Sequence, residues 1–122
     1  MMLYKTIIGQ ITLLIIIMIS MLVSCEKLDV LPETPSCIKK KIRQMKRAEV
    51  RNPPGSIWQF RYNDQIIYYI PPYCCDIPSE LLDDKCNLIC KPDGGFTGKG
   101  DGQCADFFNK RTNGVLIWQD DR

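Results

Sequence analysis

The clearest alternation of hydrophobic and polar positions lies between residues 56 and 70. The first part, residues 56–62, places an aromatic side chain at every second position, which is the period expected of a half-buried strand. The pair Asn63-Asp64, which favours tight turns, separates it from a second apolar run over residues 65–70. The pattern predicts a β-hairpin.

A helical period occurs earlier, from about residue 37 to residue 48. Ile38, Ile42 and Met45 recur at the spacing of one helix face, and Ser36 stands where a capping side chain is expected. We therefore predict a helix that packs a narrow apolar stripe on its neighbours.

The remaining predicted elements are short. Strands are expected over residues 87–91 and 115–118, and single helical turns at Leu81-Leu82, begun by Ser79, and over residues 105–110. One helix, a small sheet and long loops indicate an α+β fold, in which the N-terminal helix packs on a mainly antiparallel sheet.

The first 24 residues form a separate apolar segment. A short start with one positive charge precedes an apolar run that ends at Val23, as in an export signal. The run closes in Leu22-Val23-Ser24-Cys25, which resembles a bacterial lipobox, and the resemblance implies diacylglycerol on the Cys25 thiol and cleavage before it. A transmembrane anchor is the alternative, but the run is shorter than about 20 apolar residues and no basic cluster follows it.

The leader divides the chain into three parts. We predict a cleaved signal peptide over residues 1–24, a lipid-anchored tether over 25–36 and a disulfide-rich globular domain over 37–122. Prolines and polar residues in the tether indicate an extended spacer. Glu26 follows the anchor in place of the Asp associated with inner-membrane retention, so the expected location is the cell envelope at the outer membrane.

Cysteine usage indicates how the domain is held together. The chain has seven cysteines, and exported chains reach a compartment in which disulfides persist. With lipid on Cys25, six remain for disulfide bonds: Cys37, Cys74, Cys75, Cys86, Cys90 and Cys104. Geometry disfavours bonds within the adjacent pair and across an extended 86–90 segment. Among the pairings left, we favour Cys90 with Cys104, and Cys37 with Cys74 or Cys75.

Positive charge is concentrated in the predicted helix. Seven bases lie between residues 39 and 51 beside a single acid, Glu49: Lys39, Lys40, Lys41, Arg43, Lys46, Arg47 and Arg51. A solvated face is the ordinary role of such a run, and contact with anionic lipid headgroups near the anchor is the alternative. Because the bases are confined to one helix, we expect no nucleic-acid site.

A glycine-rich segment, residues 92–103, holds five of the eight glycines together with aspartates 93 and 101. Its acids are not spaced as in an EF-hand loop, and it lacks the ending of a phosphate-binding loop. We expect a tight loop whose aspartates accept hydrogen bonds from their own backbone, with cation binding left as the alternative.

The residue types in the chain give little support for an enzyme. The chain has no histidine, and neither paired carboxylates nor zinc-ligand spacings stand out. We therefore expect no catalytic residue, metal or cofactor. The predicted function is a non-enzymatic binding or structural module of the envelope, whose partner is a protein or a glycan. Its candidate contacts are aromatic side chains and one lysine: Tyr68, Tyr69, Tyr73, Phe96 and Lys99. Core packing is the expected fate of at least half of the aromatic ones.

A protease inhibitor is the alternative function. The segment 96–100 would be its inhibitory loop, with Lys99 entering a trypsin-like pocket, because rigid loops between disulfides serve that purpose.

Three motifs resemble those of a known family. They are CCD at residues 74–76, PDGGFTGKGDG at 92–102 and LIWQDD at 116–121. As a set they resemble a domain of unknown function that occurs in small bacterial lipoproteins. The resemblance implies an envelope lipoprotein and no catalytic residue.

Overall fold

The computed structural model describes residues 1–20, 27–74 and 76–122. Helix α1 spans Met2–Ser20. In these described ranges no helix combines the length and the apolar character needed to cross a bilayer. Cys25 and Cys75 lie outside the described residues, so the lipid attachment predicted for Cys25 and the participation of Cys75 in a disulfide stay predictions.

Within the described residues, five strands form one antiparallel sheet in the order β4-β3-β2-β1-β5. The hairpin prediction is confirmed, because its two strands pair directly and Asn63 and Asp64 both adopt positive φ in the turn. The strands are β1 (Ser56–Tyr62), β2 (Gln65–Ile70), β3 (Glu80–Leu82), β4 (Leu88–Cys90) and β5 (Thr112–Gln119).

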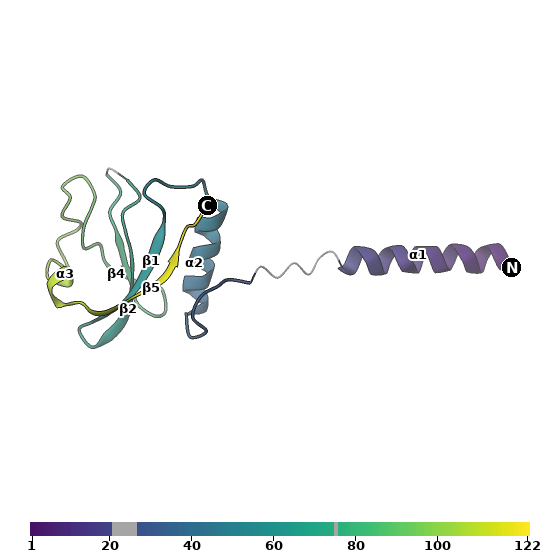
Figure 1. Cartoon of the computed structure of the whole chain (residues 1–122), viewed down its shortest axis with the longest axis horizontal. Helices are drawn as coiled ribbons and strands as arrows, with labels where there is room; N and C mark the ends of the chain where they lie inside the picture. Colours follow the sequence, from purple (N-terminus) through teal and green to yellow (C-terminus); the bar gives the residue numbers. More distant parts are fainter. Residues whose placement is uncertain (21–26, 75) are drawn as a thin grey trace.

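Helix α2, Ser36–Arg47, covers one face of the sheet (Figure 1). Its predicted apolar stripe is confirmed, and it packs on buried strand residues Ile57, Tyr68, Ile70, Leu82 and Ile117. The predicted cap is wrong. Pro35 occupies the capping position and its carbonyl accepts the first helical hydrogen bond, from the Lys39 N–H, so Ser36 is already helical.

The other face of the sheet is covered by the short helix α3, Phe107–Lys110, and by the loop before it. Figure 1 shows α2 and α3 on opposite sides of the strands. The Phe107 ring meets those of Phe60 and Tyr62 edge-on, with centroids 5.8 and 5.4 Å away, the arrangement that aromatic rings prefer. The Arg111 guanidinium lies 4.6 Å from the Phe60 centroid. The predicted helical turn over 105–110 is therefore present.

Residues 80–82 form a strand, so the helical turn predicted at Leu81-Leu82 is wrong. They pair with the outer edge of β2, Leu82 opposite Tyr68 and Leu81 opposite Tyr69. Two adjacent leucines have no period that separates a helix from a strand, and the unpaired edge of β2 offers them hydrogen-bond partners.

Two disulfides connect elements across the domain. Cys90 pairs with Cys104, as predicted. Cys37 pairs with Cys86, so its predicted bond to Cys74 or Cys75 is wrong. The reason is the strand over residues 80–82: it places the following turn, where Cys86 has a φ of 64°, at the start of α2.

The chain before α2 is not a free spacer along its whole length. Leu28 and Val30 pack against the core beneath α2, and Thr34 is buried. Thr34 closes a turn by donating its N–H to the Leu31 carbonyl, and the Lys39 ammonium donates to the Pro32 carbonyl. Packed structure therefore begins before the predicted start at residue 37.

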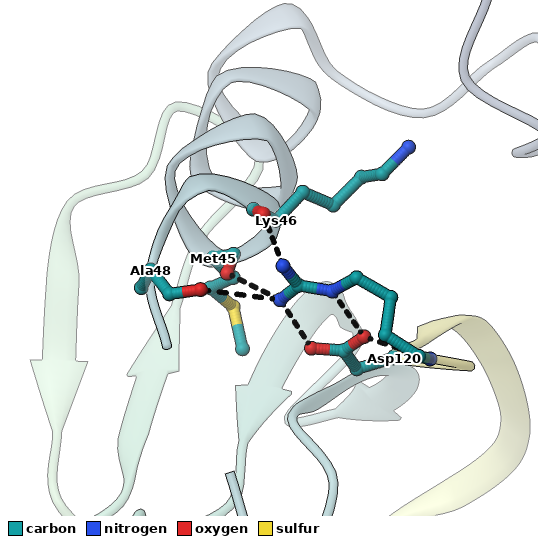
Figure 2. A network of polar contacts seen from close by, with 5 residues as sticks. Met45, Lys46, Ala48 and Asp120 are labelled. Carbon is teal, nitrogen blue, oxygen red and sulfur yellow. Dashed lines mark hydrogen bonds and ion pairs between the residues drawn. The ribbon is translucent and has the colours of Figure 1, made fainter. Parts of the chain in front are cut away.

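The carboxyl end of α2 is capped by a side chain from a distant segment. Figure 2 shows the Arg122 guanidinium donating to the carbonyls of Met45, Lys46 and Ala48 and to the Asp120 carboxylate. These carbonyls include ones that a helix end leaves without helical partners. A cation here also complements the negative end of the helix dipole. The hydrogen-bonded Arg122 holds the pKa of Asp120 below its ordinary value.

Candidate functional site

The glycine-rich loop between Cys90 and Cys104 is the candidate site. It lies on the sheet face opposite α2 and leads into α3. The disulfide joins its two ends, with Cα atoms 6.1 Å apart. Both cysteines are buried in the aromatic core, so the loop is fastened at its base.

Hydrogen bonds fix the path of the loop above that base. The Asp101 carboxylate accepts from the backbone N–H groups of Lys91, at 2.9 Å, and Gln103, at 3.0 Å. The Asp101 N–H in turn donates to the Lys91 carbonyl at 2.9 Å. The prediction that an aspartate here binds its own backbone is confirmed for Asp101.

Asp93 fastens the loop to the sheet. Its carboxylate accepts a hydrogen bond from the Tyr69 hydroxyl, and its backbone exchanges hydrogen bonds with Ser79, which is fully buried. Burial, together with the nearby Asp93, raises the pKa of Tyr69, so this hydroxyl stays protonated and keeps donating. No sequence pattern predicts that Ser79 binds the loop through Asp93.

Two glycines allow the close backbone approaches inside the loop. A Cβ on Gly100 would lie 1.7 Å from the Lys91 carbonyl oxygen, and one on Gly94 would lie 2.9 Å from that of Ile77. Both residues have positive φ, which glycine adopts without strain. The glycines therefore permit the compact path that the hydrogen bonds of Asp93 and Asp101 hold in place, although composition alone suggests a pliant segment.

The fixed loop presents its predicted contact residues to solvent. Phe96 is 92% exposed, and Lys99 three residues later is also exposed. Neither side chain contributes to the two core clusters. Phe96 is the most exposed aromatic residue of the described domain.

Tyr73, the third predicted contact, lies on a neighbouring segment. Gly94 of the loop packs against Pro72, next to Tyr73. The Arg51 guanidinium stands 4.5 Å from the Tyr73 ring centroid. Both side chains line a groove of about 140 Å³ beside Met45 and Ile77.

Tyr68 and Tyr69 are 3% and 7% exposed, so these two of the four aromatic candidates are core residues, as expected for at least half of them, and are not surface contacts. Because both sheet faces are covered, adjacent residues of β2 are buried on opposite sides. Tyr68 packs beneath α2, and Tyr69 packs among the aromatic rings near α3.

The acids near the loop are engaged by other protein groups. Asp106 accepts a hydrogen bond from the Tyr62 hydroxyl at 2.7 Å and pairs with Lys110 at 2.7 Å. The bond from Lys110 lowers the pKa of Asp106. Among the residues that the structure describes, no three His, Cys, Asp or Glu side chains are grouped as a metal site would require.

Comparison with known proteins gives one match. A family model described as a domain of unknown function (DUF6970) matches residues 43–120, which is more than half of the chain. No curated protein and no solved structure matches the chain. The matched range includes the whole glycine-rich loop and all five strands.

Proposed function

The chain belongs to the DUF6970 family, and we propose that it is a lipid-anchored binding module of the bacterial cell envelope, which recognises a protein partner through the tip of its glycine-rich loop. The observation that carries the proposal is Phe96, 92% exposed on a loop that is fixed at its base.

A rigid loop that exposes an aromatic ring has the properties of a binding anchor. Burying a phenylalanine side chain contributes about 1.5 to 3 kcal/mol. Little of this free energy is offset by loss of backbone entropy on binding, because Asp93 and Asp101 already hold the loop backbone in place. Aromatic side chains surrounded by polar groups are common anchors of protein interfaces.

The envelope location is supported by the leader. The charged start, the apolar run and the Leu-Val-Ser-Cys ending at Cys25 together have the form of a lipoprotein signal. The two disulfides fit an oxidising compartment outside the cytoplasm.

The geometry of the loop favours this function over protease inhibition. Inhibitors that bind as substrates present an extended segment that pairs with the protease backbone. Lys99 is flanked by Gly98 and Gly100, with φ of 72° and 62°. Its backbone already bridges to Gly94 within the loop. A trypsin-like panel remains the direct test, and inhibition lost in Lys99→Ala would favour the alternative.

Site-specific photocrosslinking in the producing cell tests the proposal. A photoreactive phenylalanine analogue replaces Phe96, or Asp64 in the exposed hairpin turn as the matched control. We expect one protein adduct from position 96 and none from position 64. Phe96→Ala in a purified chain should weaken binding of the captured protein at least tenfold.

Two results would contradict the proposal. Equal crosslinking from both positions would mean that the loop tip is an ordinary surface. Absence of any protein adduct, with Phe96-dependent sedimentation on purified peptidoglycan, would replace the protein partner by a glycan.

A further inference from the structure

A stripe of basic side chains follows the outward face of α2. Lys40, Arg43 and Arg47 are separated by three and four residues, so they lie on one helix face. The opposite face carries the three side chains that are buried on the sheet. Lys40 and Arg47 are exposed and Arg43 is half-buried, and the exposed Gln44 lies beside them.

This stripe has little compensating negative charge. Helix α2 contains no Asp or Glu. In the described part of the chain none of these three bases forms an ion pair, although the adjacent Lys41 pairs with Glu80. Like charges four residues apart destabilise a helix. An anionic surface facing the stripe would relieve that repulsion.

The described chain nearest to Cys25 lies on the same side of the domain. Leu28 packs beneath α2, and Lys27 lines a shallow groove together with Lys46 of the helix. Two residues span at most about 7 Å, so a lipid on Cys25 would hold the bilayer close to α2. The glycine-rich loop lies across the sheet from α2 (Figure 1).

We propose that the outward face of α2 rests on anionic phospholipid headgroups of the bilayer that holds the anchor, with the glycine-rich loop directed away from it. This inference rests on the proposed lipid anchor. Basic residues near an anionic bilayer are attracted over roughly a Debye length. An acyl anchor raises the local concentration of the helix at the surface, so a weak contact is sufficient.

Vesicle binding by a chain of residues 27–122 tests the surface without the lipid. This chain contains every residue of both core clusters and both described disulfides, and circular dichroism confirms its folding. We expect it to sediment with vesicles of phosphatidylglycerol and phosphatidylcholine at about 0.1 M salt. Binding should disappear at about 1 M salt, where the Debye length is about 3 Å.

Paired triple variants locate the contact. Lys40→Gln/Arg43→Gln/Arg47→Gln should lower the vesicle partition coefficient at least tenfold. The control, Arg61→Gln/Lys91→Gln/Lys110→Gln, removes equal charge away from α2, since Lys110 lies on α3 across the sheet, and should retain binding within twofold.

Three outcomes would overturn the proposal. They are no binding by the parent chain, equal loss in both triple variants, or stripe-dependent binding to soluble heparin with none to vesicles. The last would identify an anionic polymer as the ligand.

Orientation is tested in the intact, anchored chain. A photoreactive residue replacing Gln44 should label phospholipid, while the same residue at Phe96 should not. Lipid labelling from position 96 and none from position 44 would reverse the orientation and overturn the proposal. The loop crosslink to a protein is scored separately, so either proposal can fail alone.

Discussion

Gly100 occupies a position where any side chain would collide with the backbone across the loop. Gly98, two residues earlier, has a similar positive φ but open space around the place of a Cβ. Alanine substitutions at these two positions therefore separate the free-energy cost of backbone strain, which both share, from that of the collision, which only Gly100 has.

Gly98→Ala should lower the free energy of unfolding by about 1 kcal/mol, the strain of a left-handed alanine. Gly100→Ala should lower it by at least about 3 kcal/mol, because the Lys91 carbonyl must also move. Urea denaturation measures both. An equal decrease in the free energy of unfolding for both variants would show that the loop backbone moves to accommodate the side chain at position 100.

Arg122 and Asp120 give a second prediction at single positions. Arg122→Ala removes the cap of α2 and leaves the buried Asp120 carboxylate without its cation. We expect a thermal midpoint several degrees lower at neutral pH. Arg122→Lys should recover only part of the loss, because an ammonium cannot reproduce the planar fork of donors.

The pH dependence of stability distinguishes this ion pair from simple packing. The pKa of Asp120 is lowered in the folded chain, so its contribution is present above the unfolded pKa of about 3.9 and is lost as the pH falls through the folded value. Acidification should therefore destabilise the parent chain more than Arg122→Ala. Parallel curves for both chains would contradict the role of the pair.

At the level of elements, strong periodicity was enough to predict α2 and the hairpin. Ile38, Ile42 and Met45 mark one helix face, and the alternating aromatics mark β1. Residues 80–82 lack such a period, and their strand depends on the neighbouring edge of β2. The predicted bond of Cys37 to Cys74 or Cys75 failed for the same reason, because a disulfide partner depends on where distant elements meet, and Cys37 pairs with Cys86.

In the candidate site too, some features could be predicted from the sequence and others could not. Exposed Phe96 and Lys99 follow from their place in a glycine-rich loop. The burial of Tyr69 does not, since it requires knowing that α3 and the loop cover the second sheet face. The hydrogen bond between Ser79 and Asp93 could not be predicted either, because it joins segments 14 residues apart.

The two disulfides stabilise different elements, and their removal should differ in size. They close segments of 49 and 14 residues, for which the loop-entropy model gives about 4 and about 3 kcal/mol. Cys37→Ser/Cys86→Ser should thus be the less stable variant in urea. Cys90→Ser/Cys104→Ser should release the loop while α2 stays packed. The reverse order would show that native contacts, rather than chain entropy, set these costs.

For the whole molecule, small size makes such cross-links important. Losing about 7 kcal/mol would approach the total stability of many domains. A reductant at neutral pH should lower the thermal midpoint by tens of degrees or abolish the transition. A midpoint that moves by only a few degrees would show that packing on the two sheet faces suffices.

The proposed anchor gives a prediction for the intact protein in its cell. Cys25→Ser should abolish incorporation of labelled fatty acid and leave the unprocessed precursor, because the lipobox cysteine accepts the lipid before cleavage. Intact-mass measurement of the parent chain should show the added acyl groups. An unmodified Cys25 in the mature chain would contradict the anchor.

The helix cap formed by Arg122 also bears on the timing of export. In the proposed export the chain would emerge from its N-terminal end, so α2 would leave the channel long before its cap, which lies 76 residues from the Lys46 carbonyl that it binds. Until then the helix end relies on water for its hydrogen bonds. Under the proposed export, completion of the fold would therefore wait for the distal segment to arrive.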